Sequence, residues 1–366
     1  MTSVERREIL DAAGIGATLD TVEALQRPSG MVAWFEGGHG DPWNHVEAAM
    51  ALSAGGRLRA AERAYDWLAG HQRADGSWFN YYDWNGEVED PRLDTNVCAY
   101  VATGAWHHYL ATEDVGYLET MWPVLERAVG FVLSWQREGG EVRWSVRSDG
   151  TPEERGLLTG SSSVYLSLRC AIAAADELGR DRPDWELAAG RLRHAIAWRP
   201  DAFEPKHEYA MDWYYPVLVG ALDYVAANER MDSRFEELVI EHRGVRCVAH
   251  RPWVTAAETA ECAMALLSLG RRDQAANLLE WVQQQRCGDG SYTTGVVYPE
   301  RVTFPPDERS SYTAAAMVLA ADALSGLSGA SGLFVDGKLP AGLDLDPEPE
   351  PHGELPTGLE LRWRDR

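Results

Sequence analysis

The chain repeats a short motif in which a Gln-Arg pair is followed within a few residues by Gly and an aromatic residue. The copies are Gln26–Trp34, Gln72–Trp78, Gln136–Trp144 and Gln285–Tyr292. The first two lie about 50 residues apart, a spacing in the range of paired-helix repeats. Each copy closes an amphipathic stretch, such as Leu58–Gln72, and precedes a nearly all-apolar stretch of small residues. The amphipathic helices are therefore expected to lie outside and the Ala/Leu-rich helices inside.

Counting such pairs predicts six helical hairpins. The outer helices are expected to end near Gln26, Gln72, Gln136, Trp198, Glu241 and Gln285. The inner helices are expected to begin near Asp41, Asp94, Ser161, Asp212, Thr255 and Ser311. Six hairpins of this kind close into an all-α toroid, an (α/α)6 barrel, with the starts of the inner helices around one mouth. The long loops between outer and inner helices are expected to contribute to function.

The composition changes after about Ser328 to Gly, Pro and acidic residues. We therefore predict a barrel domain over residues 1–328 and a C-terminal tail or strap over residues 329–366. Leu343–Pro356 is expected to be solvated, because an acidic, Pro-rich stretch cannot bury enough apolar surface to fold. The last nine residues, GLELRWRDR, could fold back on the barrel, and the sequence leaves this open.

Charge and cysteine content narrow the possible partners and the compartment. The net charge of −23 makes nucleic acids and anionic membrane surfaces poor partners. No apolar run is long enough to cross a bilayer, and the first ten residues lack the apolar core of a signal peptide. Five cysteines without CxxC spacing predict reduced thiols in a cytoplasmic protein.

Aromatic residues are abundant, with 15 Trp and 14 Tyr, and many fall in predicted loops. A sugar ring can stack on an exposed aromatic face. A wall of aromatic side chains also suits a polyprenyl chain, so the aromatic content alone does not choose between these ligands. Neutral polyols, unlike nucleic acids, also tolerate a carboxylate-rich cleft.

The stretch Gly38–Leu52 places polar residues at a helix start. Asp41 and Pro42 form an N-cap followed by Pro at the first helical position, which puts Trp43 and Asn44 in the first turn. A similar arrangement returns in Trp253–Leu267. Aligning the two stretches matches Glu258 with Asn44 and Glu261 with Glu47. We expect the two helices to form two walls of one cavity.

The predicted ring of inner-helix starts holds several carboxylates. Asp41 and Asp94 can be read as N-caps or as functional groups, whereas the aromatic neighbours of Asp212 favour ligand contact. Glu258 lies inside an Ala-rich helix, where desolvation would raise its pKa as a general acid requires. A hydrogen-bonded structural role and substrate binding remain alternatives for Glu258. Glu261 lies one turn deeper.

Metal and nucleophile chemistry are not predicted. His107 and His108 are adjacent and point to different helix faces, so with His45 they do not make a zinc pattern. The run Ser161–Ser163 lacks a nucleophile elbow and a paired His. Gly37–Gly40 lacks the Lys and strand context of a phosphate loop. No metal or cofactor is expected.

The element Gln72–Trp78, QRADGSW, resembles the repeat of squalene–hopene cyclases and protein prenyltransferase β subunits, which are α/α toroids. That resemblance implies architecture alone. The DxDD motif of the cyclases is missing, since the only Asp-x-Asp pair, Asp344 and Asp346, lies in the predicted tail. The zinc ligands of the prenyltransferases have no match either.

A more specific resemblance is to actinobacterial prenyltransferase-like proteins that include the methylmannose polysaccharide hydrolases, which are endo-acting α-mannosidases. The shared blocks are GGHGDPWNHVEAAMAL, QRADGSW, DTNVCAYVATGAWHHYL, MDWYYPVLVGAL and WVTAAETAECAMAL. The resemblance implies hydrolysis of internal α-(1→4) bonds in partly 3-O-methylated mannose chains, with inversion. Some relatives carry Asp at the position of Asn44, and Asn cannot take a proton from water.

The first hypothesis is therefore an inverting glycoside hydrolase without a cofactor, acting on an oligosaccharide or polysaccharide. Glu258 would protonate the leaving oxygen, and Asp41 would activate water with Asn44 beside it. The expected substrate-binding residues are Trp43, His45, Tyr82, Asp94, Asp212, Trp213, Tyr214, Trp253 and Glu261. A terpene cyclase or prenyl-binding toroid is the second hypothesis, and a non-catalytic glycan-binding toroid is the third.

Overall fold

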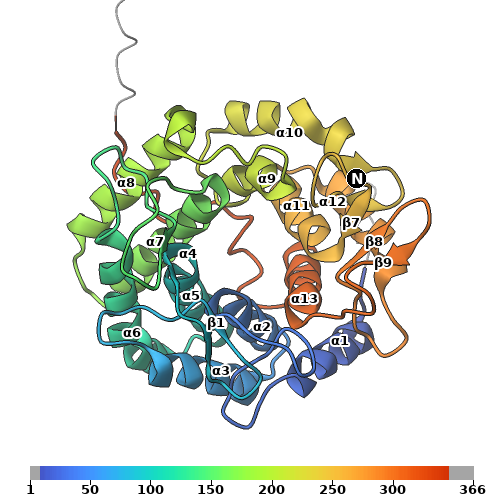
Figure 1. Cartoon of the computed structure of the whole chain (residues 1–366), viewed down its shortest axis with the longest axis horizontal. Coiled ribbons are helices and arrows are strands. Elements are labelled where there is room, and N and C mark those ends of the chain that lie inside the picture. The colour runs from blue at the N-terminus through green and yellow to red at the C-terminus, as the bar shows by residue number, and fades with distance from the viewer. Residues whose placement is uncertain (1–8, 346–366) are drawn as a thin grey trace, which may run out of the picture.

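Two concentric rings of helices form the described part of the chain, residues 9–345 of this computed structural model (Figure 1). The outer ring consists of α1 (Ala12–Ala24), α3 (Leu58–His71), α6 (Val115–Leu133), α8 (Pro183–Trp198), α10 (Tyr224–Leu238) and α12 (Arg272–Val282). The inner ring consists of α2 (Pro42–Ala54), α4 (Thr95–Ala99) with α5 (Val101–Thr112), α7 (Leu158–Glu177), α9 (Ala210–Leu218), α11 (Ala256–Ser268) and α13 (Ser311–Ser325). Outer and inner helices alternate along the chain, so the predicted all-α barrel of six hairpins is confirmed for the described residues.

The inner helices begin close to the predicted positions. Asp41 caps α2 and Asp94 caps α4, because each side chain accepts hydrogen bonds from two backbone N–H groups of the first turn. Helix α7 begins at Leu158 and α9 at Ala210, slightly before the predicted starts. Neither of these two helices has a side-chain cap, so the sequence carried no signal for their first residue.

The first three copies of the Gln-Arg motif join the end of one outer helix to the next outer helix. The Nε2 atom of Gln72 donates to Gly76 O at 3.0 Å and to Val124 O of α6 at 2.9 Å. Gly76 has a φ of +91°, and a Cβ there would lie 2.2 Å from a backbone carbonyl oxygen of α6. Only Gly therefore fits this close approach. Gln136 makes the same pair of bonds, to Gly140 O and to the backbone of α8.

The inner ring closes on itself where α13 packs between α2 and α11. The first residue of α13, Ser311, donates from its backbone N–H to Trp34 O at 2.7 Å and from its hydroxyl to Ala33 O at 2.8 Å. Small residues allow this close packing, since nearly every Ala of the inner helices is buried. The last hairpin is thus tied to the loop that precedes α2.

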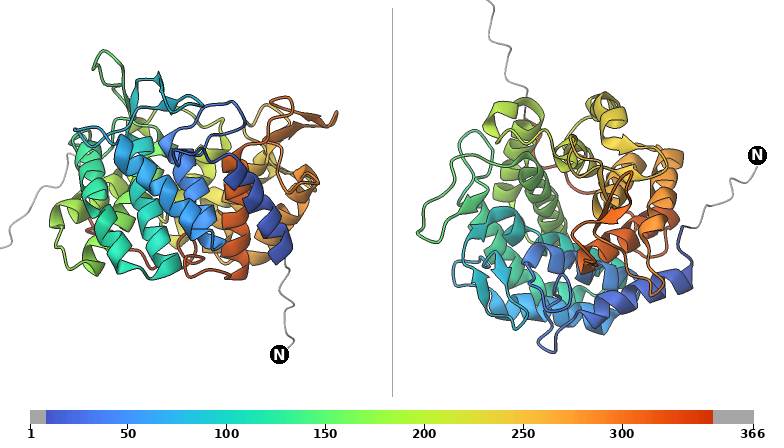
Figure 2. Two further views of the ribbon diagram at one scale, coloured as in Figure 1. Left: turned by 90° about the horizontal axis from the view of Figure 1, so that it is seen from below. Right: turned by 45° about the vertical axis from the view of Figure 1, so that its right-hand side comes forward.

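Short antiparallel strands stiffen the loops at the end of the barrel where the inner helices begin (Figure 2). Strand β1 (Tyr81–Tyr82) pairs with β2 (Val88–Asp90), β3 (Leu93–Asp94) with β4 (Ser145–Val146), and β5 (Val239–Ile240) with β6 (Gly244–Val245). A three-stranded sheet has the order β7 (Trp253–Thr255), β8 (Gly295–Val297), β9 (Val302–Thr303). Two 3-10 turns, η1 (Pro200–Ala202) and η2 (Gln283–Gln285), complete the described elements.

Residues 326–345 follow α13 and run across the end of the barrel opposite the inner-helix starts (Figure 1). From here on, the strap means this segment, which includes only the first part of the predicted tail of residues 329–366. The buried guanidinium of Arg169 on α7 donates to Pro340 O at 2.9 Å and to Leu339 O at 2.7 Å. Tyr165 Oη donates to Ala341 O at 3.0 Å. The division at residue 328 stays a prediction, and most of Leu343–Pro356 and the final GLELRWRDR lie outside the described residues. Within residues 9–345, no helix is long and apolar enough to span a membrane.

Candidate active site

A cavity of about 430 Å³, here called the central chamber, opens among the first turns of the inner helices. Its volume is in the range of small-molecule sites. Asp41, Asn44 and Glu47 of α2 line it, and so do Glu258 and Glu261 of α11. The sequence alignment that matched Asn44 with Glu258 and Glu47 with Glu261 therefore identified residues of one cavity.

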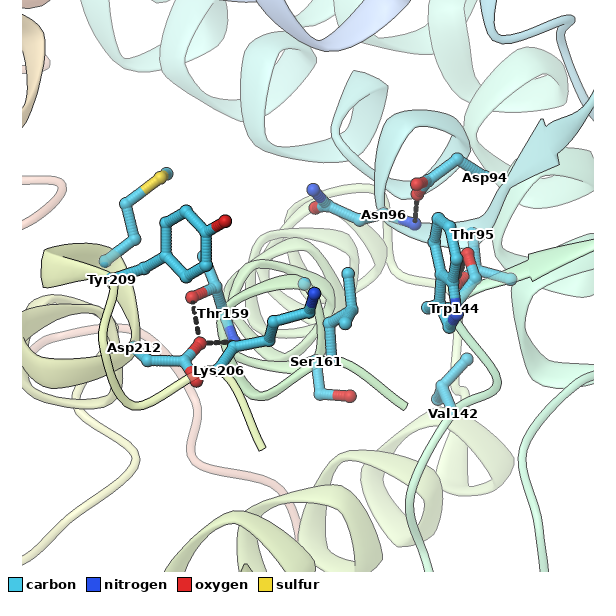
Figure 3. Close-up of a pocket in the computed structure, with 13 residues that line it drawn as sticks. Asp94, Thr95, Asn96, Val142, Trp144, Thr159, Ser161, Lys206, Tyr209 and Asp212 are labelled. Carbon is cyan, nitrogen blue, oxygen red and sulfur yellow. Dashed lines mark hydrogen bonds between the residues drawn. The ribbon is translucent and has the colours of Figure 1, made fainter. Parts of the chain in front are cut away.

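A second cavity of about 270 Å³, here called the side chamber, adjoins the central chamber (Figure 3). Both chambers are lined by Asp94, Asn96, Trp144, Thr159 and Met211. The side chamber alone is lined by Thr95, Val142, Leu157, Gly160, Ser161, Lys206, Tyr209 and Asp212. Because the two chambers share these five lining residues, they lie side by side, and we refer to them together as the cleft.

Asp41 is held rigidly at the start of α2. Its Oδ1 accepts from the backbone N–H groups of Trp43 at 2.9 Å and Asn44 at 3.1 Å. Its Oδ2 accepts from Trp34 Nε1 and from Asn44 Nδ2, both at 2.6 Å. Burial raises the pKa of Asp41 above its ordinary value, while these hydrogen bonds act to lower it. The carboxylate is therefore both desolvated and fixed in orientation.

Glu258 lies in the first turn of α11, half-buried, with its side chain in the central chamber. The half-buried thiol of Cys247 lies beside it, and burial together with the Glu258 charge raises the pKa of that thiol. Burial, and after it the nearby Glu258 charge, raises the pKa of the Tyr312 hydroxyl on α13. Glu258 thus faces the chamber from α11, which only α13 separates from α2 in the ring of inner helices.

Glu47 and Glu261 form a buried acidic pair at one wall of the central chamber. Glu261 accepts hydrogen bonds from Tyr214 Oη and, at 3.0 Å, from Tyr215 Oη. Glu47 is 2% exposed and has no hydrogen-bond partner among the described residues. Burial raises the pKa of Glu261 to about 8, and burial plus the nearby Glu261 raises the pKa of Glu47 well above its ordinary value.

Glu47→Gln should remove part of the pH dependence of stability. When the pKa of an acid is higher in the folded protein than in the unfolded chain, protonation of that acid stabilises the folded protein. This stabilisation is complete below the pKa of the unfolded chain, about 4.3, and is lost as pH rises toward the pKa of the folded protein. Between these two pKa values, the free energy of unfolding falls by about 1.4 kcal/mol per pH unit. Wild type should therefore lose at least about 2 °C more in Tm than the variant between pH 5 and pH 8. Calorimetry checks this, with exposed Glu300→Gln as the control, and parallel Tm curves would contradict it.

Four other predicted residues line the cleft. Asp94 lies in both chambers, and burial raises its pKa to about 6. Trp43 stacks on Tyr100 with ring centroids 4.5 Å apart and donates from Nε1 to Ser163 Oγ at 3.1 Å. Trp253 lies against the central chamber, and its Nε1 donates to Phe304 O of the loop after β9 at 3.0 Å. Asp212 lines the side chamber only.

Four predicted ligand-binding residues do not line either chamber. His45 is 1% exposed, and its ring accepts from Val32 N and contacts Ala64 O, so it joins the inner helix to its surroundings. Burial lowers the pKa of His45 to about 4, so it stays neutral. Tyr82 and Trp213 are buried, the latter with its indole N–H on a backbone carbonyl of α10. Tyr214 supports Glu261. Direct contact of these residues with sugar is therefore corrected to structural support.

Several cleft residues were not predicted as ligand contacts. Trp34 and Trp144 line the central chamber, and both are the aromatic residue of a Gln-Arg repeat, which was a usable signal. Tyr81 and Arg92 come from the irregular loop between α3 and α4, where no pattern indicated their direction. Tyr312 packs edge-on against Trp34 with ring centroids 5.0 Å apart. These side chains add an aromatic wall beside Asp41.

The lining of the cleft suits a polar ligand with apolar faces. Asp41, Glu47, Asp94, Glu258 and Glu261 all line the central chamber, together with the guanidinium of Arg92. Buried oxygen atoms of three lining residues have no hydrogen-bond partner within residues 9–345: Asn96 Oδ1, Ser161 Oγ and Thr255 Oγ1. A hydrocarbon chain would leave all of these groups unsatisfied. The prenyl-binding hypothesis therefore fits the cleft poorly.

A metal-binding cluster is not found in the described part of the chain, where no group of three or more His, Cys, Asp or Glu side chains could hold an ion. The acidic residues of the cleft are instead divided among the caps of α2 and α4, the buried pair and Glu258. The chemistry that these residues can supply is proton transfer and hydrogen bonding to hydroxyl groups.

Comparisons with known proteins agree with this reading of the cleft. The chain is 49% identical over 327 residues to MMP endo-(1,4)-3-O-methyl-alpha-D-mannosidase of Mycolicibacterium hassiacum, covering 89% of this chain and 90% of that protein. No protein-family model matches the chain. Among solved structures, a glycosidase variant in complex with glucose superposes with a TM-score of 0.66 at 16% identity, covering 90% of this chain and 100% of the other. A D-mannose isomerase superposes with a TM-score of 0.67 at 13% identity, covering 88% and 99%.

The two solved structures support the toroidal fold alone, since their identities are low. The mannosidase match shows more than the fold, because an identity of 49% extends over almost the whole length of both proteins. The chain therefore belongs to the family of MMP endo-(1,4)-3-O-methyl-alpha-D-mannosidases, and it is a glycoside hydrolase.

Proposed function

We propose that this protein hydrolyses internal α-(1→4)-mannosidic bonds of a 3-O-methylated mannose polysaccharide, with inversion at the anomeric carbon. The name of the relative supplies the substrate class. The observation that carries the mechanism is that Glu258 of α11 and Asp41 of α2 line the same chamber. Inversion requires an acid and a base on opposite sides of the sugar ring, roughly 6.5–9.5 Å apart, with room for a water molecule.

Glu258 is proposed as the general acid. Its proton passes to the glycosidic oxygen as the bond from that oxygen to the anomeric carbon breaks. A water molecule attacks the anomeric carbon from the other face, and its proton passes to Asp41. The leaving sugar keeps the proton of Glu258, and the new anomeric hydroxyl contains the oxygen and the remaining hydrogen of the water molecule. Proton exchange with solvent restores both carboxyl groups.

Asp41 is proposed as the base, and its surroundings explain how it could do this. Burial raises its pKa, which makes the ionised carboxylate a better proton acceptor. Trp34 and Asn44 hold Oδ2 in place. Because the amide nitrogen of Asn44 is used by Asp41, its Oδ1 is left to accept a hydrogen bond from the attacking water. Asn44 would thus position the water without taking its proton.

Binding is proposed to come from aromatic faces and from Asp94. Trp43 and Trp253 offer rings on which a sugar can stack, and Asp94 can accept from sugar hydroxyls through the oxygen not used in capping α4. Methyl ethers suit such surfaces, since each methyl group removes a donor and adds apolar area. A cytoplasmic location stays a prediction that rests on cysteine content.

The test is incubation with α-(1→4)-mannooligosaccharides, with and without 3-O-methyl groups. Mass spectrometry should show shorter oligomers that arise from cleavage of internal bonds of the starting material. Proton NMR of the first product formed should show the β-anomer at the new reducing end. Oligomers that bind but stay intact would favour the glycan-binding hypothesis, and an α-anomer as first product would overturn inversion.

Asn44→Asp should shift the pH dependence of activity to higher pH. The change removes the amide donor to Asp41 Oδ2 at 2.6 Å and adds a second carboxylate beside it. A charge-assisted hydrogen bond contributes about 1.5–3 kcal/mol, so the apparent pKa of the base should rise by about one to two units. Because the base must be ionised, the acidic limb of the kcat/KM profile should move up by that amount. An unmoved limb would contradict Asp41 as the base.

A further inference from the structure

The side chamber has walls of two kinds. Val142, Leu157, Met211 and Tyr209 present apolar surface. The indole of Trp144 lines both chambers, and Figure 3 shows it with Val142 and Tyr209 around the side chamber. Leu157 and Met211 are half-buried, so their side chains remain partly available inside the chamber. Unlike the central chamber, this cavity brings few acidic groups to its walls, namely the shared Asp94 and Asp212.

Asp212 forms the polar side of the same chamber. Thr159 donates to its Oδ1 from the backbone N–H at 3.3 Å and from the hydroxyl at 2.6 Å (Figure 3). Asp212 is 7% exposed, and both bonds from Thr159 go to its Oδ1. Its Oδ2 can therefore accept a hydrogen bond from a ligand in the chamber. A sugar hydroxyl is a donor of suitable size and charge.

The chemistry of a methyl ether distinguishes the two chambers. An ether oxygen cannot donate a hydrogen bond, so a methylated position facing Glu258 or Oδ2 of Asp94 would offer no donor to these carboxylates. The same methyl group against Met211 and Leu157 removes apolar surface from water. Free hydroxyls are therefore favoured in the central chamber and a methyl ether in the side chamber.

We propose that the side chamber is the subsite that recognises the 3-O-methyl group of the sugar next to the cleaved bond. Met211, Leu157 and Tyr209 contact the methyl group, and Asp212 accepts from a free hydroxyl of the same ring. This inference rests on the proposed function, since it concerns the same cleft and substrate. Because the two chambers share Asp94, Trp144 and Met211, a ring in one is adjacent to a ring in the other. Methylation would therefore set the register in which the chain is cut.

Binding affinities test this proposal separately from hydrolysis. The dissociation constants of two α-(1→4)-mannotetraoses, one 3-O-methylated and one not, are measured by calorimetry on the Glu258→Gln protein. The methylated tetraose should bind about tenfold or more tightly, as expected for a methyl group in an apolar pocket. Met211→Gln in the same background should reduce the preference to less than about threefold. Tyr209→Ser, at a side chain 38% exposed, should reduce it in the same direction and does not endanger folding.

Leu187→Gln is the matched control, since Leu187 is 43% exposed on α8, outside both chambers. It should leave the tenfold preference unchanged. Equal affinity for the two tetraoses, or a preference that survives in both Met211→Gln and Tyr209→Ser, would overturn the proposal even if wild type hydrolyses mannan. The absence of binding to either tetraose would overturn it too. A methyl preference without hydrolysis by wild type would uphold the subsite and overturn the proposed function.

Discussion

Glu258→Gln is expected to lower kcat by about 10²–10⁴-fold, the range supplied by general acid catalysis. Gln has the shape of Glu but cannot give up a proton, so the leaving oxygen would depart without protonation. Glu258 is half-buried in the chamber and is not an N-cap or part of an ion pair of the described residues, so the fold should tolerate the change. Initial rates on a 3-O-methylated mannooligosaccharide, measured by product quantification, give the effect.

The control for this loss is Glu300→Gln, an exposed residue in the turn between β8 and β9. It should keep wild-type kcat. Calorimetric binding of the same oligosaccharide should persist in Glu258→Gln, because the aromatic faces and Asp94 remain. If kcat falls by less than about tenfold, Glu258 is not the acid. If binding disappears together with turnover, Glu258 is a binding group and the two-carboxylate mechanism loses its acid.

Asp41→Asn is expected to lower kcat by a similar factor of about 10²–10⁴, because an amide cannot accept the proton of water. Asn is as good an N-cap as Asp, so the bonds from the backbone N–H groups of Trp43 and Asn44 can persist. The amide nitrogen of the new residue would face Trp34 Nε1 and Asn44 Nδ2, two donors that bind Oδ2 in the wild type. The expected result is therefore a large loss of turnover together with a lower Tm. Steady-state kinetics and calorimetry on the same preparation measure both quantities.

Asp11→Asn provides a matched control. Asp11 caps α1 through Gly14 N at 2.7 Å, far from the cleft, so the same substitution is made at the same kind of position. It should change neither kcat nor Tm appreciably. Retained turnover in Asp41→Asn would exclude Asp41 as the base. Asp94, which shares the central chamber and has its pKa raised to about 6, would then be the next residue to replace.

The architecture was predictable because the repeated signals are local. The Gln-Arg motif marks the end of an outer helix and supplies the Gly needed for close approach to the next one, as Gly76 shows against α6. The Asp-Pro pair at Asp41 marks an inner helix start. The hairpins that lack the motif were still found, since α9 and α11 are runs of buried apolar residues bounded by loops.

Part of the candidate site was predictable for the same reason, and part was not. Residues in the first turn of an inner helix lie near the mouth, but the helical period decides which of them face the cavity. Asn44 and Glu47 face it, whereas His45 between them faces α3. Tyr215 faces it and Tyr214 does not. The directions of Tyr81 and Arg92 depend on how their loop is paired, including the bridge between Tyr82 and the distant Gly40, which no local pattern indicates.

The strap determines how a polymer can reach the site. Arg169 binds the carbonyls of residues 339 and 340, and the strap crosses the end of the barrel opposite the inner-helix starts (Figure 1), so we expect a polymer to enter from the other end. A glycan then does not have to pass a free end through the protein, and any internal segment of the glycan can bind at the mouth of the barrel. Both fragments then leave from the end of the barrel at which the polymer entered. We therefore expect each cleavage to require a new binding event, without movement of the enzyme along one polymer chain.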